Sequence, residues 1–193
     1  EQATATHEGI EARCELDTRA DTCCAGINCK PIFFTGQQCK VQGFYDGFTP
    51  VPDVPVATVA TVWSDPLTGN GCVVIIHKAL YFGHTMDHSL INPNQLRHHG
   101  VIVHDNPYDV DPTKSMGIEV DDNDLISFLS KSTMVFFNTR YPDNNELDMY
   151  PHVVTSDTPW DPHGLVMPGG LDDTDDPVND HMIQWVTSNA TNG

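Results

Sequence analysis

The sequence predicts a mainly β fold with one or two short helices. Two apolar, β-branched runs, 54–63 and 72–82, flank the turn-rich segment SDPLTGNG. Runs of this length and composition, bounded by Gly, Pro, Asn and Asp, are typical of paired strands. The other apolar runs are short and are also separated by turn residues. We therefore expect 54–82 to form an antiparallel hairpin within a β-rich domain.

The segments before this hairpin are expected to be an arm, two strands and a loop. Residues 1–10 are polar and lack periodicity, so they predict an N-terminal arm. The run 11–18 predicts the first strand, and PIFF at 31–34 predicts a short strand that stops at Thr35-Gly36. The segment 39–56 is rich in aromatic residues and glycine and leads into prolines.

Beyond the hairpin, the segment 89–100 predicts a short helix that begins near Pro93 and ends at Gly100. VIVH at 101–104 predicts another short strand, and the region 116–142 predicts two or three more. No internal repeat is present. These elements complete the expected β-rich fold.

The net charge is -18, from 27 acidic and 9 basic residues. Such a surface repels phosphate backbones and anionic lipid headgroups, so we expect neither nucleic-acid nor membrane partners. No apolar run approaches the length that spans a bilayer. The start of the chain has neither an initiator Met nor a signal-peptide pattern, which predicts a fragment or a processed product.

Cysteine usage leaves the redox compartment open. Five of the six cysteines fall within residues 14–39, and the full set is Cys14, Cys23, Cys24, Cys29, Cys39 and Cys72. An even number allows disulfides, and a reduced protein can bury the same residues as small apolar side chains. Asn189-Ala190-Thr191 fits the glycosylation sequon, which makes Asn189 a candidate glycan acceptor.

The stretch CELDTRADTCC, residues 14–24, carries the candidate catalytic group. Asp17-Thr18 follows a predicted strand, and an Asp-Thr pair at a strand tip is how aspartic proteases carry a catalytic carboxylate. These enzymes need two carboxylates that share one proton, one as base and one as acid. No second Asp-Thr/Ser-Gly triplet occurs, and Asp157-Thr158 is followed by Pro159. An active form would therefore be a homodimer with Asp17 from each subunit.

The order of the segments over roughly residues 11–104 resembles the retropepsin-like protease of copia-type retroelement polyproteins. LDTRAD lies where the family has its catalytic turn, and CKVQGFYDGF lies where it has a Gly-rich flap. The runs 54–63 and 72–82 match the paired strands after the flap. SLINPNQLRHHG is similar to the segment that the copia-type proteins have in place of the retropepsin helix.

This resemblance implies a small β-barrel, no cofactor, and a peptide substrate if the domain is active. It assigns the catalytic carboxylate to Asp17, a bracing hydroxyl to Thr18 and the small residue after the turn to Ala20. It also assigns a flap, whose residues are Gly43, Phe44, Tyr45 and Gly47. The remaining chain would be a β-rich extension at 105–167 and an acidic linker with a C-terminal strand or tail at 168–193.

Arg19 departs from the family pattern, because it stands where these enzymes have Gly. That Gly lets the backbone approach the substrate and the partner loop closely. A guanidinium beside Asp17 would favour the ionised carboxylate, which works against a shared proton. The sequence thus predicts a retropepsin-like domain of weak or no activity, an inherited scaffold in the second case.

Other chemistry has weaker signals. His84 and His88 would share a face if they were helical, as in zinc sites, but no Glu follows His84 as in HExxH. Acidic residues between 105 and 124 could hold calcium, although their spacing misses the EF-hand loop. A Cys–His nucleophile has no local signature. We expect no metal and no cofactor.

A second hypothesis is structural. The apolar run HMIQWVTS at 181–188 could add a strand to the exposed sheet edge of a neighbouring copy. Head-to-tail contacts of this kind generate filaments when they do not close. The two hypotheses predict different compartments: intracellular for a retroelement protease, and extracellular for a disulfide-bonded assembly subunit.

Overall fold

The computed structural model describes residues 11–43, 45, 47–108, 115–120, 124–156 and, as backbone, 183–186. These residues form a mainly β fold with two short α-helices, as predicted. The strands are β1 Glu11–Leu16, β2 Cys24–Ala25, β3 Lys30–Val41, β4 Val51–Ser64, β5 Gly71–Tyr81, β6 Ser89–Ile91, β7 Val103–His104, β8 Gly117–Glu119, β9 Leu125–Ser127, β10 Leu129–Lys131, β11 Met134–Arg140, β12 His152–Val154 and β13 Ile183–Val186. The helices are α1 Pro93–His98 and α2 Asn144–Met149, and a 3-10 turn, η1, covers Gly83–Thr85.

The predicted hairpin is confirmed. Strands β4 and β5 pair antiparallel from Val56↔Leu80 to Ser64↔Gly71, with one register shift. The turn between them is held by the Asp65 carboxylate, which accepts hydrogen bonds from the Leu67 N–H and from the N–H and hydroxyl of Thr68. Asp is favoured at this position because its side chain can bond the backbone two residues on.

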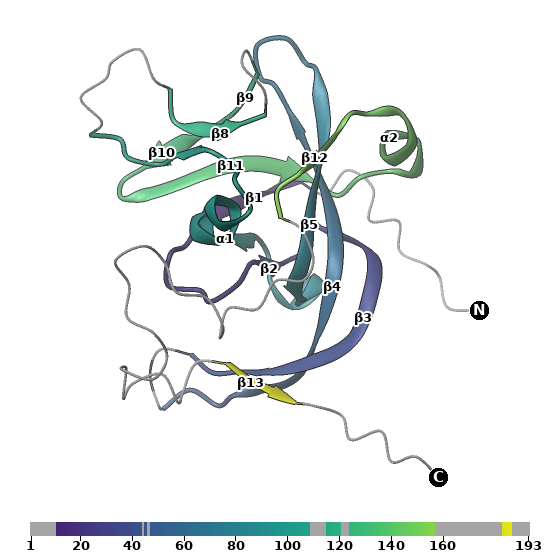
Figure 1. Cartoon of the computed structure of the whole chain (residues 1–193), viewed down its shortest axis with the longest axis vertical. Helices are drawn as coiled ribbons and strands as arrows, with labels where there is room; N and C mark the ends of the chain where they lie inside the picture. The colour runs from purple at the N-terminus through teal and green to yellow at the C-terminus, as the bar shows by residue number, and fades with distance from the viewer. Residues whose placement is uncertain are drawn as a thin grey trace.

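Most strands join one sheet, in the order β10-β11-β1-β6-β2-β5-β4-β3-β13, with β12 beside β5 (Figure 1). A further pairing, Arg140↔Val62, brings β11 next to β4. Within the described residues, the pairings β11-β1-β6-β2-β5-β4 thus lead back to β11. A separate three-stranded sheet has the order β7-β8-β9.

The order β1-β6-β2 positions the candidate site. β1 and β2 are consecutive in the sequence, yet β6 lies between them, parallel to β1 and antiparallel to β2. The connection 17–23 therefore spans β6 instead of closing a simple hairpin. This arrangement brings the segment after β6, including α1, next to that connection.

The helix α1 begins at Pro93, as the sequence predicts, and ends at His98, two residues before the predicted cap Gly100. Asn92 is the N-cap residue, and its side chain accepts hydrogen bonds from the N–H groups of Asn94 and Gln95. Pro93 occupies the first turn, where its missing N–H costs nothing. Gly100 has a φ of +82°, a conformation that glycine adopts without a Cβ penalty.

Two expectations about the strands, one boundary and one number, are wrong. β3 does not stop at Thr35-Gly36 but continues to Val41. The register against β4 shifts between Phe34 and Gln38, and Gly36 takes a φ of +81° within this irregularity. A glycine inside a strand can mark such a bulge and need not end the strand. Among the described residues between 116 and 142, four strands form instead of two or three, because β9 and β10 are separate short strands.

The expected division at residue 104 does not separate the strands of the large sheet. β11, from the segment expected to be an extension, pairs with β1 over Glu11–Glu15. β12 pairs in parallel with β5. The main core cluster includes Phe137 and Phe128 from the later segment together with Val59 and Ile76 of the hairpin.

Candidate active site

The connection that carries Asp17 begins directly after β1. The Asp17 N–H donates to the carbonyl oxygen of Ile91 in β6, at 2.9 Å. The Asp17 carboxylate accepts a hydrogen bond of 2.8 Å from the Arg19 N–H, so residues 17–19 form a short Asx turn. Asp17 and Ala20 are half-buried, whereas Thr18 and Arg19 are exposed.

Two buried polar side chains brace this connection from the segment after β6. The Asn92 side-chain amide donates to the carbonyl oxygen of Ala20, while its oxygen caps α1. The Gln95 oxygen accepts hydrogen bonds from the Cys23 N–H at 2.9 Å and from the Thr22 hydroxyl at 3.0 Å. Neither role was predicted from the sequence, although an Asn immediately before a helix-starting Pro is a recognisable cap signal.

Arg19 affects the turn differently from expectation. It is not among the residues with positive φ, so its backbone conformation does not require glycine. Within the described part of the chain, its guanidinium makes no ion pair, and the contact with the Asp17 carboxylate comes from the Arg19 backbone N–H. What distinguishes Arg19 from Gly here is therefore an exposed, permanently charged side chain next to Asp17.

Cys24 is the first residue of β2, directly after this connection, and is half-buried. Burial, together with the nearby carboxylates of Asp17 and Asp21, raises the pKa of the Cys24 thiol to about 12. Cys24 also packs against a cluster that contains Cys39, Val54 and other residues near the tip of the β3–β4 hairpin. Residues near the tip of this hairpin thus pack against the strand that follows the Asp17 connection.

The predicted flap forms the tip of that hairpin, between Val41 and Val51. The rings of Tyr45 and Phe48 meet edge to face with centroids 5.9 Å apart, and Tyr45 is 64% exposed. A Cβ on Gly47 would lie 2.2 Å from the Tyr45 ring, so this glycine allows the ring to pack close to the backbone. Phe44 lies outside the described residues.

None of the possible disulfides is present, because all six cysteines are free. The buried thiols contact polar groups on other strands: Cys14 lies 3.4 Å from the Thr139 hydroxyl, and Cys29 lies 3.3 Å from the Ser89 hydroxyl. Burial raises the pKa of Cys14 to about 11 and raises the pKa of Cys29 further. These residues act as small core side chains and not as nucleophiles at their ordinary pKa.

The alternative sites do not assemble within the described residues. His84 belongs to η1 and His88 lies just before β6, so the two do not share a helix face. His88 instead lies 2.5 Å from the Asp87 carboxylate. No group of three or more His, Cys, Asp or Glu side chains in this part of the chain is arranged to hold a metal ion. Asn189 lies outside the described residues.

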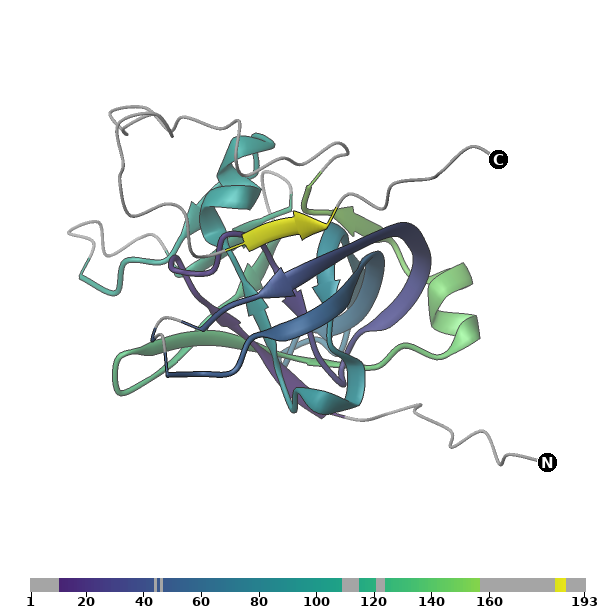
Figure 2. The same ribbon diagram turned by 90° about the horizontal axis from the view of Figure 1, so that it is seen from below.

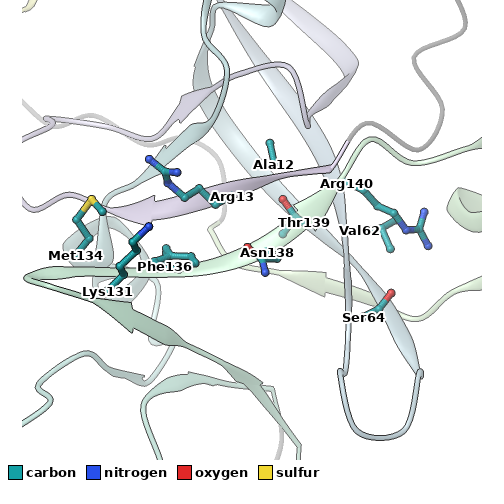
Figure 3. A pocket seen from close by; sticks show the side chains of 10 residues that line it. All are labelled: Ala12, Arg13, Val62, Ser64, Lys131, Met134, Phe136, Asn138, Thr139 and Arg140. Carbon is teal, nitrogen blue, oxygen red and sulfur yellow. The ribbon is translucent and has the colours of Figure 1, made fainter.

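A shallow pocket of about 540 Å³ lies elsewhere, where β1, β10, β11 and β4 meet (Figure 3). Arg13, Lys131 and the apolar Met134 and Phe136 gather at one end, and Arg140 and Ser64 lie at the other. Arg13 pairs with Glu15, and Arg140 pairs with Glu146. The pocket includes none of the predicted catalytic or flap residues.

No family model, curated protein or solved structure matches the chain. No helix among the described residues is long and apolar enough to cross a membrane.

Proposed function

We propose that the chain is a retropepsin-like domain derived from a copia-type retroelement polyprotein, in which Arg19 weakens or abolishes peptide cleavage. The observation that carries this proposal is the construction of the Asp17 turn. The turn leaves the end of β1, and the connection that carries it is held by hydrogen bonds with 89–100, which resembles the segment that copia-type proteins have in place of the retropepsin helix. Two separate parts of the resemblance therefore meet at one place.

Three further observations support the proposal. The flap-like segment is the tip of a long hairpin, and near this tip Cys39 and Val54 pack against Cys24, which follows the connection that carries Asp17. The strand pairings lead from β11 through β1, β6, β2, β5 and β4 back to β11 by the single pair Arg140↔Val62, which supports the proposed small barrel. Asp17 is half-buried, which leaves it accessible to a second subunit.

In this proposal the active unit is a homodimer with one Asp17 carboxylate from each copy. The two carboxylates would share a proton, activate a water molecule and protonate the leaving amine. Two Arg19 side chains would enter the same small space, one beside each carboxylate. Their bulk hinders the approach of the two turns, and their charges favour a state in which both carboxylates are ionised.

The test compares three forms of the full chain on a peptide library at mildly acid pH: native, Arg19→Gly and Asp17→Asn. We expect cleavage by Arg19→Gly, little or none by the native chain, and none by Asp17→Asn. Robust cleavage by the native chain that depends on Asp17 would show that Arg19 does not disable the site.

Self-assembly is the second candidate function, and one observation favours it. β13, which comes from the predicted C-terminal apolar run, pairs antiparallel with the edge of β3. The chain therefore contains both a strand edge and a terminal segment that pairs with it. Such a pair of elements can also join separate copies.

A further inference from the structure

Among the described strands, β13 pairs with β3 alone. Ile183, Gln184, Trp185 and Val186 pair with Val41, Lys40, Cys39 and Gln38 in that order. β13 is the last strand in the sheet order, so its other side has no strand partner within the described residues. Figure 2 shows β13 lying beside β3.

The contact between β13 and β3 has properties that favour exchange of β13 between copies of the chain. It consists of four residue pairs, and a short two-stranded contact is marginally stable by itself. β13 is separated from β12 in the sequence by residues 155–182, so its place beside β3 is not set by a tight turn. A β13 strand from another copy of the chain can make the same four backbone pairs.

The edge of β3 continues beyond the part that β13 covers. In the described part of the chain, Lys30–Gln37 has β4 on one side and no strand on the other. This stretch exposes three consecutive large apolar side chains: Ile32 is 52% exposed, Phe33 62% and Phe34 49%. An exposed apolar strand edge is a ready site for pairing with another chain.

Charge also favours a second copy at this edge. The stretch KPIFFTGQ contains no acidic residue, although the chain as a whole carries a net charge of -18. The ammonium of Lys30 is held by the Asn144 side chain at 2.6 Å and lies at one end of the stretch. Two strongly acidic copies can therefore approach at this edge with less repulsion than at an acidic face.

We propose that the outer edge of β3 is a docking surface for a second copy of the chain. Ile183–Val186 of each copy pairs with Gln38–Val41 of the other, and the run Ile32–Phe34 is covered in the resulting dimer. The intramolecular pairing has the advantage of a high effective concentration of β13, but it leaves the run Ile32–Phe34 exposed. The exchanged form differs from it by covering this run. This inference rests on the self-assembly candidate and is independent of Asp17 chemistry.

The test uses two full-length single variants, Lys40→Cys and Gln184→Cys. These positions are directly paired, and directly opposed Cα atoms in an antiparallel pair lie about 4.5–5.5 Å apart, within the range that a disulfide bridges. When the two variants are mixed under oxidised glutathione, a disulfide between the two introduced thiols joins two chains only if the strand of one copy pairs with the edge of the other. We expect this heterodimer on a non-reducing gel.

The control replaces Lys40→Cys with Leu67→Cys. Leu67 lies in the β4–β5 turn and is 93% exposed, so its thiol would be more accessible but not opposite β13. Each single variant alone measures any cross-linking through the native cysteines. Adding Phe33→Asp to both chains should lower the heterodimer yield about tenfold, whereas adding Leu67→Asp should leave it unchanged.

Sedimentation of the native chain, run in parallel, separates two kinds of failure. If the native chain dimerises but the Lys40→Cys/Gln184→Cys pair gives no more heterodimer than the Leu67→Cys control, the β3 docking surface is overturned. Self-assembly would then use another surface. A native chain that stays monomeric at all concentrations, together with the absence of the heterodimer, would overturn both the β3 docking surface and self-assembly. Equal heterodimer yields with Phe33→Asp and Leu67→Asp would contradict the proposal that the run Ile32–Phe34 is covered in the dimer.

Discussion

The side-chain oxygen of Gln95 accepts a hydrogen bond of 2.9 Å from the backbone N–H of Cys23, although the two residues are 72 positions apart. The same oxygen accepts the Thr22 hydroxyl, and the Gln95 amide donates to the carbonyl oxygen of His77. Gln95 is fully buried. The Gln95 side chain thus connects α1, β5 and the end of the connection 17–23 that carries Asp17.

Replacing Gln95 by Leu is expected to lower the free energy of unfolding by about 2–4 kcal/mol. The change keeps a similar side-chain volume but leaves the Cys23 N–H and the His77 carbonyl buried without these partners. Urea unfolding followed by circular dichroism measures the loss. The control is Gln37→Leu, at an exposed position of β3, which should change stability by less than about 0.5 kcal/mol. Equal losses would show that the buried bonds of Gln95 do not matter.

Asn92 has two separable roles, the cap of α1 and the bond to Ala20. Asn92→Ala removes both, whereas Asn92→Ser keeps a hydroxyl that can cap the helix but is too short to replace the amide donor. We expect Asn92→Ala to be less stable than Asn92→Ser by about 1 kcal/mol, and Asn92→Ser to be less stable than the native chain. If Asn92→Ser matches the native stability, the bond to Ala20 does not hold the turn.

The pair of Arg140 and Glu146 predicts a loss of stability in acid. The hydrogen bond from Arg140 holds the pKa of Glu146 below its ordinary value, and the Asp143 N–H adds to this effect. A carboxyl with a lowered pKa in the folded state stabilises the fold above its unfolded-state pKa, near about 4.3, and this contribution disappears as the pH falls through the folded-state pKa.

Glu146→Gln should therefore lower stability at neutral pH and weaken its decline below about pH 4.3. The measurement is the free energy of unfolding as a function of pH. Asp148→Asn, an exposed change on the same helix, is the control and should leave the profile close to that of the native chain. A native-like acid profile for Glu146→Gln would contradict the role of this pair.

All six cysteines are expected to be titratable as free thiols only after unfolding. Burial raises the pKa of each thiol, to about 11 for Cys14, Cys39 and Cys72 and to about 12 for Cys24. The reactive thiolate is therefore scarce in the folded protein at pH 8. A colorimetric thiol reagent should react slowly before guanidinium is added and with six groups afterwards, without reductant. Fewer than six would indicate disulfides.

The sequence predicts local elements of this fold better than its long-range pairings. The hairpin of β4 and β5 and the capped helix α1 depend on nearby residues, namely the Asp65 turn and the Asn92-Pro93 start. The wrong end of β3 has a local cause as well, because Gly36 fits both a strand end and a bulge. By contrast, the position of β11 beside β1 joins residues more than 120 positions apart, and no local pattern predicts it.

In the candidate site, too, local features can be predicted from the sequence and long-range contacts cannot. The position of Asp17 after a strand follows from the sequence around it. The bracing by Gln95 does not, since a Gln in a short helix has the same local pattern whether it faces solvent or a buried N–H. Arg19 could be recognised as a departure from the family pattern, but its ordinary backbone conformation could not be predicted from the residue type.

The central claim is that Asp17 belongs to a dimeric aspartic site that Arg19 disables. The most direct measurement is the peptide cleavage rate of a fixed amount of the Arg19→Gly chain as the double variant Arg19→Gly, Asp17→Asn is added. Because each site needs Asp17 from both copies, we predict that the rate falls toward zero as mixed dimers replace active ones. A rate that stays constant, or the absence of any cleavage by Arg19→Gly, would contradict the account.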